Sequence, residues 1–140
     1  MVSKKIAVVM GSDSDWPVVE KAVRQLEALG IETEVRVMSA HRTPEAARNF
    51  ALTAREAGFG AIIAAAGKAA HLAGALAAAS TLPVIGIPVA SVAIDGAQNG
   101  ALLAAQMLAI YDGELAARLD ELRREMEAAT LGKEDRKSVV

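Results

Sequence analysis

Short apolar runs alternate along the chain with longer segments in which apolar residues recur every three or four positions. The continuous runs 6–10 and 61–66 are typical of parallel strands covered on both faces, and a further strand is predicted at 33–38. The segments 16–29 and 44–57 have helical stripes, and each is followed by a glycine. This order of strands and helices predicts an α/β fold, a three-layer αβα parallel sheet with right-handed crossovers.

The second half of the chain has a less regular pattern. An alanine-rich helix is predicted to end near Ser80, and residues 82–95 then contain two strand-like runs with almost nothing between them. Neighbouring parallel strands need a crossover of about a dozen residues, so these runs predict one long strand or one strand bent at Pro88. The next helix, 99–110, is apolar nearly all round and is expected to be buried on more than one side.

A last helix is predicted after Asp112, which we expect to cap it. Its apolar positions form a narrow stripe with spacings of four, three and four: Leu115, Leu119, Leu122 and Met126. Such a stripe packs on the body of the protein or on a neighbouring subunit, and the pattern favours the body. We predict a single domain over residues 1–131 and a frayed tail over 132–140.

The composition and net charge of the chain argue against several classes of partner and of site. The chain has 140 residues and a net charge of −2, which gives no reason to expect a nucleic acid or an anionic membrane as partner. With no cysteine and two histidines, it offers no disulfide framework, no thiol nucleophile and no set of zinc ligands, so we predict no metal site.

Two segments bear on whether the protein is exported or inserted in a membrane. The N-terminus leads into only five apolar residues, too few for a signal peptide, and we expect a cytoplasmic protein. Residues 69–94 carry no formal charge, but they are mostly alanine and glycine and contain Pro83 and Pro88. We therefore expect this segment to form a buried helix and strand, and not a membrane span.

Three loops that follow predicted strands are expected to meet at one edge of the sheet, where open parallel sheets bind ligands. They are 11–15, 39–42 and 67–74. In the second loop His41 is a candidate proton shuttle, and Arg42 can hold phosphate or carboxylate with paired donors. The alternative is an ordinary solvated turn that leads into a helix capped by Thr43.

The other two loops also allow both functional and structural interpretations. Ser12 and Ser14, with backbone N–H groups and Arg42, can bind a phosphate, while a carboxylate such as Asp15 accepts from ribose hydroxyls. Alternatively, Ser14 or Asp15 caps the first helix. His71 is either a pocket residue or a hydrogen-bonded structural histidine, and Lys68 is either an anion ligand or an exposed side chain.

Two familiar relatives of this architecture fit poorly. A phosphoacceptor receiver needs an aspartate at the end of the third strand, and here that strand ends in three alanines. A flavodoxin surrounds its flavin with aromatic rings, and the whole chain has only one tryptophan, one tyrosine and two phenylalanines.

Four motifs together carry a closer resemblance. They are Met-Gly-Ser-Asp-Ser-Asp-Trp at 10–16, Ser-Ala-His-Arg-Thr-Pro at 39–44, Ala-Ala-His-Leu at 69–72 and Leu-Leu-Ala-Ala-Gln at 102–106. In this order and spacing they resemble class I N5-carboxyaminoimidazole ribonucleotide mutases, enzymes of bacterial purine biosynthesis. The resemblance implies a flavodoxin-like homo-octamer without metal or organic cofactor. It also implies an isomerase that moves a carboxylate from an exocyclic nitrogen to C4 of the aminoimidazole ribonucleotide.

The resemblance further implies a role for each candidate residue. His41 would be the general acid/base. The phosphate would be bound by Ser12, Ser14 and Arg42, and the ribose by Asp15. The wall of the pocket would be formed by Ser39, Ala69, Ala70 and His71. In this chemistry the carbamate releases CO₂, C4 recaptures it and a base removes the C4 proton. No covalent nucleophile is needed, which suits a chain without cysteine.

The chain also departs from the family pattern. Ala65, Lys68 and Ala73 replace residues of the family's glycine-rich loop, and a single Gly-Ile-Pro-Val at 86–89 stands where the family has two such repeats around a further segment. A strand and a helix, with their pocket and subunit contacts, are therefore expected to be missing near residues 86–91. Two alternatives follow: a catalytically inactive nucleotide-binding or oligomeric scaffold, and a phosphate-binding module with another ligand, such as flavin or a dinucleotide.

Overall fold

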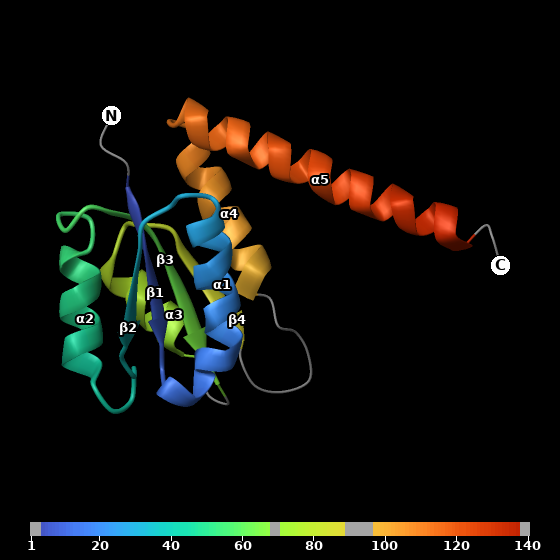
Figure 1. The fold of residues 1–140 in the computed structure, drawn as a ribbon. Helices are drawn as coiled ribbons and strands as arrows, with labels where there is room; N and C mark the ends of the chain where they lie inside the picture. Colours follow the sequence, from blue (N-terminus) through green and yellow to red (C-terminus); the bar gives the residue numbers. More distant parts are fainter. Residues whose placement is uncertain (1–3, 68–70, 89–96, 138–140) are drawn as a thin grey trace.

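The computed structural model describes residues 4–67, 71–88 and 97–137, and its centre is a four-stranded parallel sheet (Figure 1). The strands lie in the order β2-β1-β3-β4, and every neighbouring pair is parallel. Their bounds are β1 (Lys5–Met10), β2 (Thr33–Val37), β3 (Phe59–Ala66) and β4 (Val84–Pro88). The predicted α/β class and parallel sheet are confirmed.

Helices cover both faces of the sheet, which gives the predicted three layers. A short 3₁₀ turn, η1 (Asp13–Asp15), precedes α1 (Trp16–Ala28), and α1 lies with α4 (Ala97–Ala109) on one face. The other face is covered by α2 (Pro44–Thr53) and α3 (Leu72–Ala79). The last helix, α5 (Gly113–Lys137), follows α4 directly.

The core consists of two clusters separated by the sheet. Successive side chains of a strand point to opposite faces, so Ile6 and Val8 pack toward α1 and α4 while Ala7 and Val9 pack toward α2 and α3. All four side chains are fully buried. The continuous apolar run that predicted β1 is therefore explained by helices on both faces.

The end of the second helix differs from the prediction. α2 stops at Thr53, and the chain turns through residues 54–58 before β3 begins at Phe59. Gly58 has a φ of 89°, and its N–H donates to the carbonyl of Arg55 at 3.1 Å. Glycine adopts this left-handed conformation at no steric cost, so it reverses the chain here.

The segment 82–95 is resolved in part. Within the described residues, the strand ends at Pro88, in agreement with a break at that proline, and any continuation falls on residues outside the described part of the chain. α3 and β4 form the helix and strand expected for 69–94. Among the described residues, no helix is both long and apolar enough to cross a bilayer.

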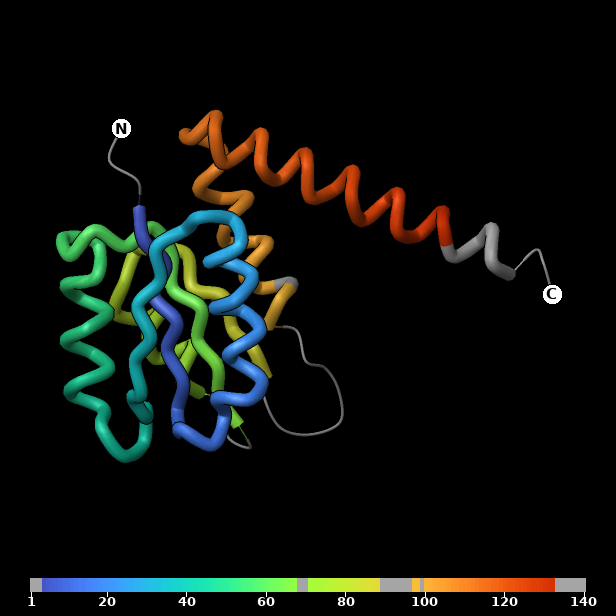
Figure 2. Tube along the Cα trace, viewed as in Figure 1, coloured from blue at the N-terminus to red at the C-terminus, as the bar shows by residue number. Residues whose placement is uncertain are grey.

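α5 packs on the body through its first turns only. Asp112 caps it as predicted, because its Oδ1 accepts from the N–H of Leu115 at 3.0 Å. Leu115 and Leu119 are buried, whereas Met126 is 53% exposed. Figure 2 shows that the later turns of α5 project from the body. The helix continues to Lys137, beyond residue 132, where the sequence pattern predicts the start of a frayed tail. This stretch contains Lys133, Glu134 and Arg136, and lysine, glutamate and arginine are good helix formers.

Candidate functional site

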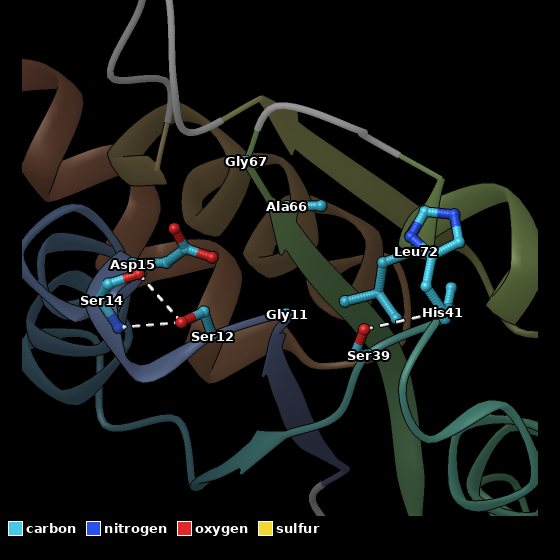
Figure 3. A pocket seen from close by; sticks show the side chains of 10 residues that line it. Gly11, Ser12, Ser14, Asp15, Ser39, His41, Ala66, Gly67 and Leu72 are labelled. Carbon is cyan, nitrogen blue, oxygen red and sulfur yellow. Dashed lines mark hydrogen bonds between the residues drawn. The ribbon is translucent and has the colours of Figure 1, made fainter.

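The three predicted loops meet at the carboxyl ends of β1, β2 and β3. A cavity of about 390 Å³ lies between them (Figure 3). Ten residues line it: Gly11, Ser12, Ser14, Asp15, Ser39, Ala40, His41, Ala66, Gly67 and Leu72. Five of the predicted site residues are in this lining. Arg42 and His71 bond to its loops, and Ala69 and Ala70 lie outside the described residues.

The first loop presents two hydroxyls and a carboxylate. Ser12 caps the 3₁₀ turn, since its Oγ accepts from the backbone N–H of Ser14 at 3.3 Å and from the Ser14 hydroxyl at 2.9 Å. Asp15 occupies the position before α1, but its side chain makes no capping bond. The expectation that Ser14 or Asp15 caps the first helix with its side chain is therefore wrong.

The carboxylate of Asp15 is buried in the wall of the cavity. Its residue is only 8% exposed, and in Figure 3 the carboxylate points toward Gly67. A Cβ on Gly67 would lie 3.8 Å from Asp15 Oδ1, so this glycine leaves the space above the carboxylate open. A carboxylate in this position can accept hydrogen bonds from ligand hydroxyls.

The second loop is held by its own hydroxyl groups. Ser39 Oγ accepts from the backbone N–H of His41 at 3.3 Å and from that of Arg42 at 3.1 Å. Thr43 Oγ1 accepts from the N–H of Ser39 at 2.9 Å and donates to the Ser39 carbonyl at 3.2 Å. Thr43 thus stands at the cap position of α2 without the side-chain capping bond that we predicted, and its hydroxyl closes the loop that carries His41.

Arg42 joins the second loop to the first. Its Nη2 donates to the carbonyl of Gly11 at 2.9 Å. A guanidinium has five N–H donors in a planar fork, so others remain to face a ligand at the rim of the cavity. Sequence reasoning missed this contact, because a backbone carbonyl acceptor leaves no signature in the sequence.

The two histidines of the chain lie in direct contact. His41 Nε2 and His71 Nδ1 are 3.0 Å apart, and the rings meet edge to face at 84°. This hydrogen bond needs one nitrogen to donate and the other to accept, so at least one ring is neutral while the bond exists. His71 is exposed at the N-terminus of α3. It is not among the residues that line the cavity, and its contact with His41 fits both a pocket residue and a hydrogen-bonded structural histidine.

Sequence reasoning also missed the apolar side of the cavity. Leu72 is 2% exposed and forms part of the lining beside Ala40 and Ala66. Leu72 begins α3, and its apolar character alone indicates a core residue. Its place in the lining follows from the meeting of β3 and α3, which only the fold reveals.

The fold and site define a class: a flavodoxin-like α/β protein with an imidazole, a buried carboxylate and paired hydroxyls around one cavity. In the described residues no group of three or more histidine, cysteine, aspartate or glutamate side chains could hold a metal ion. The family model described as AIR carboxylase matches residues 5–91 and 86–129. The chain belongs to the AIR carboxylase family.

Individual relatives agree with this family. The chain is 45% identical over 148 residues to a protein of Brucella melitensis named N5-carboxyaminoimidazole ribonucleotide mutase, covering 88% of this chain and 91% of the relative. A Pyrococcus abyssi protein of the same name is 43% identical over 145 residues, covering 87% and 83%. The structure of Treponema denticola PurE superposes with a TM-score of 0.81 at 26% identity, covering 96% of this chain and 98% of that one.

The comparisons also bear on the expected missing segment. The alignment with the Brucella protein runs over 148 positions, more than the 140 residues of this chain, so the relative carries residues that have no counterpart here. The two ranges matched by the family model overlap at 86–91, the stretch that contains the single Gly-Ile-Pro-Val. Both findings agree with a segment missing near residues 86–91.

Proposed function

We propose that this chain is an N5-carboxyaminoimidazole ribonucleotide mutase, an isomerase of purine biosynthesis. Eight relatives with this name are 39–46% identical to it over most of their length. The observation that carries the proposal is the cavity in which the His41 imidazole lies across from the Ser12 and Ser14 hydroxyls and the Asp15 carboxylate. The substrate is a small anionic ribonucleotide, and CO₂ is the transferred fragment.

The two ends of the cavity suit the two ends of such a substrate. Ser12, Ser14 and Arg42 bind the phosphate, since hydroxyls and a guanidinium supply donors and the N-terminus of α1 lies beside them. Asp15 accepts from the ribose hydroxyls. This arrangement leaves the aminoimidazole ring facing His41, and the family resemblance adds Ser39, Ala69, Ala70 and His71 as the wall of the pocket.

The reaction needs only one mobile proton. Breaking the N–C bond of the carbamate releases CO₂ and leaves a nitrogen that takes up a proton. C4 of the ring then forms a C–C bond to the carbon of CO₂ and gives up its own proton. His41 can donate the first proton and accept the second, so it ends in its starting state. General acid/base groups of this kind contribute on the order of 10²–10⁴ in rate.

Assembly and location form part of the same proposal. We propose a homo-oligomer in the cytoplasm, with an octamer as the state implied by the family resemblance, and a single domain over residues 1–131. Because the relatives carry residues that are missing here, a catalytically inactive scaffold that still binds the nucleotide is the second candidate.

The test combines binding with turnover. N5-carboxyaminoimidazole ribonucleotide is added to the purified chain, the thermal midpoint is recorded, and formation of the C4-carboxylated product is followed by ultraviolet absorbance. If the chain is the mutase, the substrate raises its thermal midpoint and the C4-carboxylated product forms. A shift without product supports the scaffold, while a larger shift with flavin mononucleotide or a dinucleotide overturns both candidates. Light scattering of the same sample gives the oligomeric mass.

A further inference from the structure

Among the described residues, the second strand lies at an edge of the sheet with no strand on its outer side. β2 is the outermost strand of the four, beside β1 (Figure 1). On its inner side the N–H of Ile6 donates to the carbonyl of Glu32 and the N–H of Met38 donates to the carbonyl of Met10, both at 2.9 Å. Even-numbered residues of this strand therefore direct their backbone groups toward β1.

The odd-numbered residues direct their backbone groups away from the sheet. In a parallel ladder, the residues that bond to one neighbour alternate with those that face the other side. Thr33, Val35 and Val37 consequently present N–H and C=O groups along the outer edge of β2. Val35 is 37% exposed and Val37 is 54% exposed, so the edge is apolar as well as rich in backbone donors and acceptors.

A hollow of about 750 Å³ lies next to this edge, between β2 and α2. Residues 34–38 line one side of it, and α2 lines the other through Ala46, Asn49 and Thr53. The core residues Phe50 and Phe59 also line it, so the hollow extends over the face of the sheet that α2 covers. An added strand would lie about 4.8 Å from β2, in line with the sheet.

The charges on β2 are arranged for self-pairing. Proteins often protect an edge strand with charged side chains that keep other strands away. Here, however, Glu34 and Arg36 have opposite signs and flank Val35 symmetrically, and they already form an ion pair with each other. Lys5 Nζ also bonds to Glu34 at 2.8 Å. An antiparallel second copy centred on Val35 would face each of these two charges with the opposite sign.

We propose that β2 pairs antiparallel with β2 of a second copy of this chain, about a two-fold axis at Val35. The register then pairs Val35 with the partner's Val35, and Thr33 with the partner's Val37. These are the residues whose backbone groups face outward, and in such pairs both N–H···O bonds are exchanged. Glu34 lies opposite the partner's Arg36 in a close pair without backbone bonds, where side chains approach most closely.

The charge pattern selects this axis among those that the backbone allows. An antiparallel pair can have its two-fold axis at an outward-facing residue, in a pair that exchanges both backbone bonds, or at an inward-facing residue, in a pair without them. An axis at Glu34 or at Arg36 would place identical charges opposite each other, so the charges are self-complementary only about Val35. A centre at Thr33 or Val37 would leave one of the two charges outside the paired stretch. The pairing joins two four-stranded sheets into one continuous sheet and leaves the cavity that contains His41 at the carboxyl ends of the strands.

A single cysteine reports this register, because the chain has no cysteine of its own. In the Val35→Cys variant the two substituted positions face each other with Cα atoms about 5.5 Å apart, within the range of a disulfide. In the control, Thr33→Cys, the substituted positions are separated by four residues of strand, roughly 13 Å. Copper phenanthroline oxidation at low protein concentration is expected to crosslink Val35→Cys at least ten times faster than the control.

A charge exchange tests the same pairing without crosslinking. Arg36→Glu places glutamates opposite each other across the axis, and we expect the dissociation constant of the pair to rise at least tenfold in analytical ultracentrifugation. Adding Glu34→Arg to the same chain reverses both signs and restores the complementarity, so the double variant is expected to associate again. Circular dichroism verifies that each variant is folded.

The two experiments decide the proposal together. It is supported by fast crosslinking at position 35 and by recovery in the double variant. Equal crosslinking rates at positions 33 and 35 overturn it, as does a single charge variant that associates as well as the original chain. A folded monomer that does not crosslink also overturns it, and would leave the edge of β2 to a strand of a different protein.

Discussion

Replacing His71 with phenylalanine keeps an aromatic ring at the N-terminus of α3 and removes the nitrogen that lies 3.0 Å from His41 Nε2. If His71 orients the imidazole of His41, the variant loses one hydrogen bond to the reacting base. Such a bond contributes about 0.5–1.5 kcal/mol in water-exposed surroundings. Since 1.36 kcal/mol corresponds to a factor of ten in rate, we expect kcat to fall roughly 2- to 13-fold.

The assay separates positioning from binding. Initial rates of C4 carboxylation are measured over a range of substrate concentrations and pH, for the original chain and for His71→Phe. We expect the loss in kcat with little change in KM, because the variant removes the bond to the His41 ring and leaves the residues that line the cavity in place. His71→Asn is the matched control, since its amide places a polar atom close to the position of Nδ1 and should recover part of the rate.

An unchanged kcat in His71→Phe would show that His71 does not position His41. A rise in KM with constant kcat would instead assign His71 to substrate binding alone, as the family resemblance implies. Thermal midpoints of all three proteins are recorded in parallel. Because His71 is exposed, we expect them to agree within a few degrees.

Two further predictions concern stability. Asp112→Ala removes the cap that accepts from the N–H of Leu115, and we expect a loss of about 0.5–2 kcal/mol in urea denaturation, whereas Asp112→Asn should retain most of it. Hydrogen bonds from Lys5 and then Arg36 hold the pKa of Glu34 below its ordinary value of 4.5. Glu34 therefore stabilises the fold above that pH, and this contribution is lost as the pH falls through the lowered pKa. Glu34→Gln should accordingly show a flatter decline of the thermal midpoint below about pH 4.5, and an equal decline in both proteins would contradict the assignment.

The layered fold could be predicted because its signals are local and redundant. The continuous apolar runs around Val8 and Ile63 can be satisfied only by strands covered on both faces, and the helical stripes between them supply the cover. The ends of the helices are harder to predict from the sequence. Nothing in the residues 54–57 marks the end of α2 at Thr53, because the turn is determined by Gly58 and by the start of β3.

The sequence predicts which residues line the site, but not the hydrogen bonds that they make. Strand order alone brings Ser12, Asp15 and His41 to one edge, and all three line one cavity. Their chemical roles stay predictions. The hydroxyl of Ser39 holds its own loop, and Arg42 reaches back to a backbone carbonyl. Such contacts depend on side-chain direction across two loops, which spacing along the chain does not encode.

We propose that His41 moves the proton during carboxylate transfer in this cavity. The most direct test is the turnover of His41→Asn with N5-carboxyaminoimidazole ribonucleotide, measured beside calorimetric binding of the product. We predict that the rate falls by a factor of about 10² or more while the dissociation constant changes less than about fivefold. Turnover within about threefold of the original chain would show that His41 is not the group that moves the proton.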